Sequence, residues 1–163
     1  MTTGNTQFGA NHTIIDGKDH LDCWGIIDEN VNLVIGSWPQ KLGKRVSFRM
    51  RDIEWINSSG MRAWALFMRA FIEGREVSFE ECSPAVIQQV NMVPNFIPTG
   101  SIRSFVIPFA CNSCSTRGDI LAQTSDFKPS ASKPLDVPLC TKCGESMSCQ
   151  EELSEYLVFV QNS

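Results

Sequence analysis

The sequence has no excess of basic residues and no long apolar run. It contains 14 Lys and Arg against 18 Asp and Glu, which leaves a net charge of −4. Affinity for a phosphate backbone depends mainly on clustered Lys and Arg, so this balance argues against nucleic acid as a partner. No segment approaches the roughly 18 to 20 apolar residues that cross a bilayer, and residues 1–12 do not resemble a signal peptide. We therefore expect a cytoplasmic protein without membrane association.

Residues that support catalysis are also scarce. The two histidines, His12 and His20, both lie near the start of the chain, which disfavours a Cys/His hydrolytic site. A hydrolase needs an unsaturated metal or a nucleophile beside a histidine base, and a nucleotide enzyme needs a glycine-rich phosphate loop. Residues 43–45, Gly-Lys-Arg, lack the preceding glycine and the spacing of such a loop. These absences favour a non-enzymatic protein.

Cysteine, in contrast, is present seven times, an odd number that fits a complete disulfide framework poorly. Four of these residues form two Cys-x-x-Cys pairs, Cys111 with Cys114 and Cys140 with Cys143. Two intervening residues allow a tight turn to bring both sulfur atoms to one metal, about 2.3 Å away for zinc. Four thiolates complete a tetrahedral Zn²⁺ and leave no position for water. We therefore expect a structural zinc site.

Alternatives for the two pairs are a redox dithiol or unbound thiols. A thioredoxin-type site would use one pair at the start of a helix, not two turns joined by a polar loop. Of the remaining cysteines, we expect Cys23 and Cys82 to be ordinary buried thiols. Cys149 lies beyond the spacing of the second pair but is a candidate substitute ligand.

Residues 13–108 carry the alternating strand and helix patterns of an α/β core. Val46, Phe48 and Met50 alternate with polar residues, as in a strand with one buried face. The expected elements are a hairpin (13–27), a loop or broken helix (28–43), a strand (45–56), a helix (58–73), a strand (75–82), a helix (84–93) and a strand (101–110). This order predicts right-handed crossovers on one mostly parallel sheet. Residues 124–138 contain three prolines without periodicity and predict a flexible loop.

Residues 57–60, Asn-Ser-Ser-Gly, separate the strand from the helix. Asn57, Ser58 and Ser59 are each able to cap the helix, because a side-chain oxygen accepts a hydrogen bond from an unpaired N–H of the first turn. The same N–H groups and the positive end of the helix dipole would also stabilise a phosphate on either serine. The residues alone leave both roles open.

The alternating strand, the Ser-Ser-Gly element opening an amphipathic helix, and the following strand and helix SPAVIQQVNMV together resemble the STAS domain. This is the fold of bacterial anti-anti-sigma factors and of the cytoplasmic parts of sulfate transporters; the transporter branch is disfavoured because no membrane segment is visible. The resemblance covers residues 13–108 and departs from the family's Asp-Ser-Ser-Gly signature at Asn57. It implies a STAS-like mixed sheet with helices packed on it in a domain over 1–108. The cysteine pairs predict a zinc-ribbon tail over 109–163, which is not part of the standard STAS domain.

The resemblance also implies a function in bacterial signalling. In anti-anti-sigma factors a partner kinase phosphorylates the serine before the glycine, here Ser59, with Ser58 beside it, and this breaks the complex. The implied partner is an anti-sigma-type kinase or another signalling protein. It would contact Asn57, Ser58, Ser59, Gly60 and Arg62. An alternative is a STAS domain that senses a nucleotide or lipid without a phospho-switch.

Two further expectations concern the surface. Four arginines are candidates for a basic rim near the Ser-Ser-Gly element or for ordinary solvated faces: Arg49, Arg51, Arg62 and Arg69. The tryptophans are expected in the core, except that Trp38 beside Pro39 is the best candidate for an exposed contact.

Overall fold

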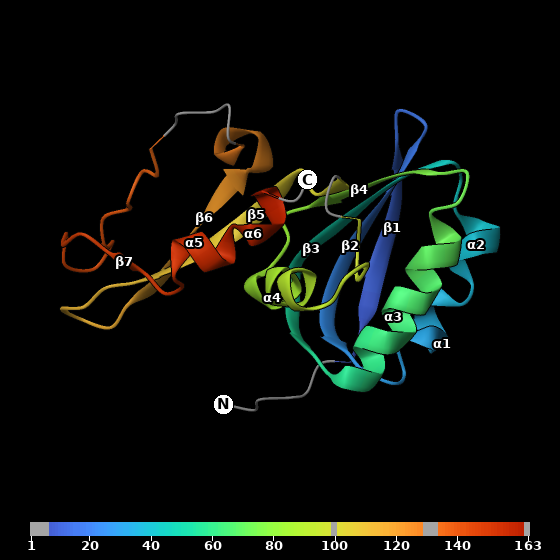
Figure 1. Ribbon diagram of the computed structural model, residues 1–163, viewed down its shortest axis with the longest axis horizontal. Helices are drawn as coiled ribbons and strands as arrows, with labels where there is room; N and C mark the ends of the chain where they lie inside the picture. The colour runs from blue at the N-terminus through green and yellow to red at the C-terminus, as the bar shows by residue number, and fades with distance from the viewer. Residues whose placement is uncertain (1–6, 99–100, 129–133, 162–163) are drawn as a thin grey trace.

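The computed structural model describes residues 7–98, 101–128 and 134–161, and in these ranges the strands form two sheets of order β1-β2-β3-β4 and β6-β5-β7. Helices α1, α2 and α3 lie at one end of the molecule, and the second sheet lies with α5 and α6 at the other (Figure 1). The elements are β1 (Gly9–Ile15), β2 (Lys18–Ile27), α1 (Asn32–Ile35), α2 (Trp38–Lys41), β3 (Arg45–Ile56), α3 (Ser58–Phe71), β4 (Glu76–Glu80), α4 (Pro84–Met92), β5 (Ser104–Ala110), β6 (Arg117–Gln123), the 3-10 helix η2 (Thr124–Phe127), β7 (Ser148–Cys149), α5 (Leu153–Tyr156) and α6 (Val158–Gln161). None of the described helices is both long and apolar enough to cross a bilayer.

The first two strands form the expected antiparallel hairpin. Ile15 pairs with Lys18 across a two-residue turn in which Asp16 and Gly17 have φ of +50° and +70°. Positive φ at both positions matches the right-handed twist of paired strands. The hairpin is longer than expected, because residues 9–12 also pair with β2.

Strand β3 lies in the middle of the sheet and pairs in parallel with both β2 and β4. Its bounds and the burial of its first half agree with the sequence pattern. Two register irregularities against β2 each place one extra residue in β3, which moves the buried positions to Ile53 and then Ile56. Trp55 is left 58% exposed.

Trp38 is not the exposed tryptophan. It is 5% exposed, and its ring lies 5.4 Å from that of Phe48 and 6.2 Å from that of Trp64. The short helix α2 places it between the sheet and α3, where apolar area is removed from water. The expectation of an exposed contact at Trp38 is wrong, because an unpatterned segment can still deliver one large side chain to the core.

Helix α3 covers one face of the sheet as its periodicity predicts. Trp64, Met68 and Phe71 are buried, and Trp64 and Phe71 each place a ring about 6 Å from Phe48. Further along the chain, Ser83 caps α4 by accepting a hydrogen bond from the N–H of Val86 at 3.4 Å, as predicted.

The strand over 101–110 does not complete the first sheet. β5 pairs antiparallel with β6 and β7, and its segment meets the first sheet through isolated parallel bridges, Phe79 with Ile102 and Cys82 with Phe105. The expectation of one continuous sheet is wrong at this strand. β6, which the sequence patterns left unassigned, pairs with β5 over seven residues and occupies one of its edges. β5 also runs across position 108, so the cysteine-bearing sheet begins before that residue.

Residues 153–161 contact both β5 and α4. The Tyr156 hydroxyl donates to the carbonyl oxygen of Val106 at 2.6 Å, and the rings of Phe159 and Phe105 are 5.1 Å apart. The Asn91 side chain donates to the carbonyl oxygens of Glu155 and Tyr156 and accepts from the N–H of Phe159. Of the loop expected at 124–138, residues 124–127 form η2, and 129–133 lie outside the described residues.

Candidate functional site

The second sheet brings the four cysteines of the two Cys-x-x-Cys pairs together. Their Sγ atoms all lie within 4.8 Å of one another, and all four thiols are free. The Sγ atoms of Cys111 and Cys143 are 3.4 Å apart, and those of Cys114 and Cys140 are 3.5 Å apart. Sulfur atoms around a tetrahedral metal with bonds of about 2.3 Å are separated by roughly 3.8 Å. This spacing and donor set fit one metal ion.

The two pairs adopt the same turn. The N–H of Cys111 donates to the carbonyl oxygen of Thr116 at 2.9 Å, and the N–H of Ser115 donates to that of Cys111 at 2.9 Å. Residues 140–145 repeat both bonds at 2.8 and 2.9 Å. The residue after the second cysteine has positive φ in both turns, +57° at Ser115 and +78° at Gly144. The backbone therefore presents both pairs of sulfur atoms in the same way.

Hydrogen bonds favour the thiolate at two positions of the cluster. A hydrogen bond with the Thr116 hydroxyl, and after it one with the Thr116 backbone, lower the pKa of Cys114 to about 6. The backbone N–H of Cys143 and then a second N–H of the same turn lower the pKa of Cys140. At Cys143 a hydrogen bond from the N–H of Glu145 also lowers the pKa. Hydrogen bonds with the other thiols and desolvation outweigh this effect and raise the pKa of Cys143 to about 12. Metal ligation requires thiolates, so two of the four ligands are already favoured.

The other three cysteines do not join the cluster. Cys149 lies in β7 opposite Phe109, outside the group of four. Cys23 and Cys82 are buried in the core as predicted, and burial raises the pKa of both thiols. Thr116 and Ser115 were not found from the sequence. The sequence pattern that could have identified them is the spacing: Ser115 and Thr116 follow Cys114 at the same positions at which Gly144 and Glu145 follow Cys143.

Asn57 is the cap of α3. Its Oδ1 accepts from the N–H of Gly60 at 2.7 Å, and its own N–H donates to the carbonyl oxygen of Ile27 at 3.1 Å. Its Nδ2 donates to Oε2 of Glu29 at 3.1 Å. A carboxylate at position 57 would cap the helix equally well but would face Glu29 without a proton to donate. The amide at this position therefore has a local reason.

The remaining residues of the helix start divide between packing and exposure. Gly60 is buried against the end of β2, where an added Cβ would lie 2.2 Å from the Ile27 carbonyl oxygen. Ser58 and Ser59 are exposed on the first turn, and Arg62 is exposed one turn later. Asn57 and Gly60 thus hold the turn in place while the two serines face solvent.

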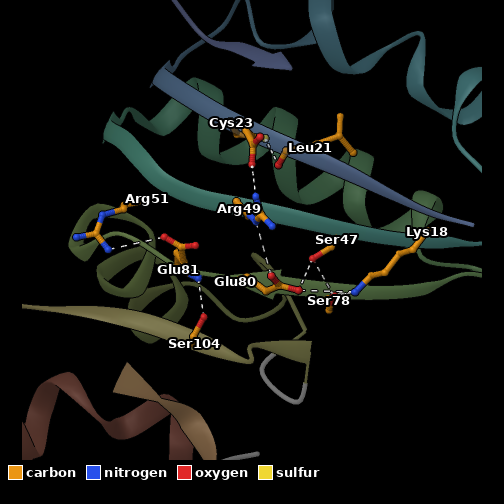
Figure 2. Close-up of polar contacts among 11 residues, drawn as sticks. Lys18, Leu21, Cys23, Ser47, Arg49, Arg51, Ser78, Glu80, Glu81 and Ser104 are labelled. Atoms are coloured by element: carbon orange, nitrogen blue, oxygen red, sulfur yellow. Dashed lines mark hydrogen bonds and ion pairs between the residues drawn. The ribbon is translucent and has the colours of Figure 1, made fainter. Parts of the chain in front are cut away.

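Arg49 and Arg51 do not contribute free positive charge, because carboxylates hold both. Arg49 bonds Asp22 at 3.3 Å and lies 3.9 Å from Glu80, which also accepts from Ser47 at 2.6 Å (Figure 2). The second arginine, Arg51, is 2.6 Å from Asp119 of β6 and 3.7 Å from Glu81. These two arginines belong to a charge-balanced face of the sheet.

Comparisons of the chain with protein-family models, with curated proteins and with solved structures found no match. The molecule has an α/β fold with a mixed sheet, helices packed on it and a cysteine cluster near the C-terminus. The STAS resemblance rests on the residues quoted above and stays a prediction.

Proposed function

We propose that this protein is a non-enzymatic regulatory interaction module that resembles an anti-sigma factor antagonist and carries a structural zinc site. The observation that carries this proposal is the start of α3. Two exposed serines occupy the first turn of a 14-residue helix whose position is held by the Asn57 cap and by the contact of Gly60 with β2. A partner would therefore meet these hydroxyls at a helix start whose position these two contacts fix.

A phosphate on Ser59 would act as a switch at this surface. Its oxygens would accept from N–H groups of the first turn and interact favourably with the helix dipole. It would also add close to two negative charges, which changes the electrostatics of any interface formed there. Arg62 lies three residues later on the same side of the helix and would be a cation within one turn of this phosphate. A signalling partner such as an anti-sigma-type kinase would respond to this change of charge.

We assign the cysteine cluster to zinc because four sulfur ligands in two repeated turns suit its tetrahedral coordination. Cysteine would fill all four positions, so the ion would be structural. It would join the β5–β6 hairpin to residues 139–146, which pair in the described structure through one bridge between Leu139 and Ser146. Binding free energy of about 10 kcal/mol or more would then stabilise this part of the fold.

The switch is tested by mass spectrometry of the native protein and by partner capture from its own lysate. The variants are Ser58→Asp/Ser59→Asp, Ser58→Ala/Ser59→Ala and, as a control at another exposed serine, Ser125→Asp. We expect phosphate on Ser59 or Ser58, and a partner that the double-Asp variant alone fails to retain. Identical captured proteins for all variants, together with unmodified serines, would refute the switch.

A further inference from the structure

Helix α3 and the segment over residues 93–98 enclose a groove of about 690 Å³. Its walls are mostly apolar and include Met61, Ala65 and Ile72 from the helix and Val93 from the opposite side. From Met61 to Ile72 the helix rises about 16 Å, or three turns. The groove therefore follows about three turns of α3 and begins two residues after Ser59.

Two arginines accompany the apolar walls. Arg62 and Arg69 both line the groove and are exposed. Within the described parts of the chain neither has an ion pair or a side-chain hydrogen bond, in contrast to Arg49 and Arg51. They are seven residues apart, so they lie on one side of the helix about 10 Å from each other. Leu66, 65% exposed, lies between them.

We propose that this groove binds an acidic amphipathic helix of a partner protein. An apolar helix face would fill the groove, and carboxylates seven residues apart on that helix would meet Arg62 and Arg69. Two cations about 10 Å apart match two carboxylates of one helix better than the single charge of one lipid headgroup, which favours a peptide over a single-chain amphiphile. The charge of the two arginines selects an acidic partner over a basic one. The proposal rests on the proposed function, since it names the partner surface beside Ser59.

The test uses the full, unmodified protein and a fluorescein-labelled helical peptide. The peptide has about 16 residues, with leucines on one face and glutamates seven residues apart beside them; a second peptide carries lysine in place of glutamate. The protein variants are Arg62→Glu/Arg69→Glu, which inverts the groove charge, and Leu66→Ser, which removes an exposed apolar side chain. Lys44→Glu/Arg103→Glu is the matched control, because it changes the net charge equally at exposed positions outside the groove.

Fluorescence anisotropy is expected to show binding of the acidic peptide that weakens at higher salt. Charge inversion at the groove should weaken it at least tenfold and improve binding of the lysine peptide. Leu66→Ser should weaken binding severalfold, and the control variant should bind as wild type. Because the protein is unmodified, these results would stand even if Ser58 and Ser59 are never phosphorylated in cells.

Three results would overturn the proposal. Equal binding of both peptides, or binding unchanged by Arg62→Glu/Arg69→Glu, would exclude charge selection at this groove. Displacement of an apolar dye by decanoate but not by the acidic peptide would assign the groove to an anionic amphiphile. A dimer in sedimentation that only the groove variant loses would assign it to a second copy of the chain.

Discussion

Gly60 on α3 lies against the carbonyl group of Ile27 at the end of β2, and an ideal Cβ at position 60 would be 2.2 Å from that oxygen. Helix and strand can approach this closely because glycine has no side chain. The glycine of the Ser-Ser-Gly element therefore sets where the first turn of α3, with Ser58 and Ser59, lies on the sheet.

Gly60→Ala is expected to destabilise the protein by about 1–3 kcal/mol, because the new methyl group must displace backbone. A loss of stability would be informative, because alanine within a helix is otherwise about 1 kcal/mol more favourable than glycine. Urea denaturation of the variant and of Ser59→Ala, an exposed control on the same turn, measures the effect. A variant as stable as wild type would show that α3 is not held against Ile27.

Asn57→Ala should cost about 1 kcal/mol of stability through loss of the cap bond to Gly60. Asn57→Asp keeps a capping oxygen but places a second carboxylate beside Glu29. In the wild-type protein Glu29 accepts a hydrogen bond from the Asn57 amide, which the variant loses. Glu29→Gln should therefore raise the free energy of unfolding of the Asn57→Asp variant by more than it changes that of the wild-type protein. A double-mutant cycle from urea denaturation gives this coupling, and a coupling of zero would contradict the contact.

Wild-type protein and Cys149→Ser are expected to carry one zinc ion per chain, whereas Cys114→Ser should carry less. The reason is that Cys114 belongs to the cluster and Cys149 does not. Metal analysis by mass spectrometry and thermal denaturation with and without a chelator provide the measurement. If Cys149→Ser loses zinc and Cys114→Ser retains it, the fourth ligand is Cys149 and not Cys114.

Zinc affinity is expected to fall as the pH is lowered. Ligation replaces protons on thiols, so protons compete with the metal, and the affinity is greatest on the alkaline side. Competition with a chromophoric chelator at several pH values measures it, with the chelator's own protonation taken into account. An affinity independent of pH would be incompatible with thiolate ligands.

Asn91→Asp is expected to loosen residues 153–161 without affecting the first sheet. The amide nitrogen of Asn91 donates to the carbonyl oxygens of Glu155 and Tyr156, at 3.3 and 3.0 Å, and a carboxylate would repel both. The loss should be about 1–3 kcal/mol. Hydrogen exchange should show faster exchange over residues 153–161 and unchanged protection in β2 and β3. Asn11→Asp, an exposed change in β1, is the control.

Local patterns were enough wherever neighbouring residues decide the structure. The alternation around Phe48 predicted β3, the spacing of Trp64, Met68 and Phe71 predicted α3, and Ser83-Pro84 predicted the start of α4. Each rests on a short-range preference of the backbone or on one buried face. The two Cys-x-x-Cys pairs also identified their four cysteines as one cluster, because two tight turns are sufficient to present four sulfur atoms.

Choices between equivalent candidates needed the tertiary structure. Asn57, Ser58 and Ser59 are equally good caps in the sequence, and the approach of α3 to Ile27, with Glu29 beside it, selects Asn57. The pairing of β5 was decided by β6, a strand without a clear pattern.

The sequence by itself determined the α/β alternation, the main helix and the cysteine cluster, because these follow from periodicity and spacing along the chain. Tertiary structure decided which sheet receives β5, which tryptophans are buried and which arginines remain unpaired. Those outcomes depend on contacts between residues far apart in sequence. Arg51 pairs with Asp119 of β6, whereas Arg62 and Arg69 lie beside the groove.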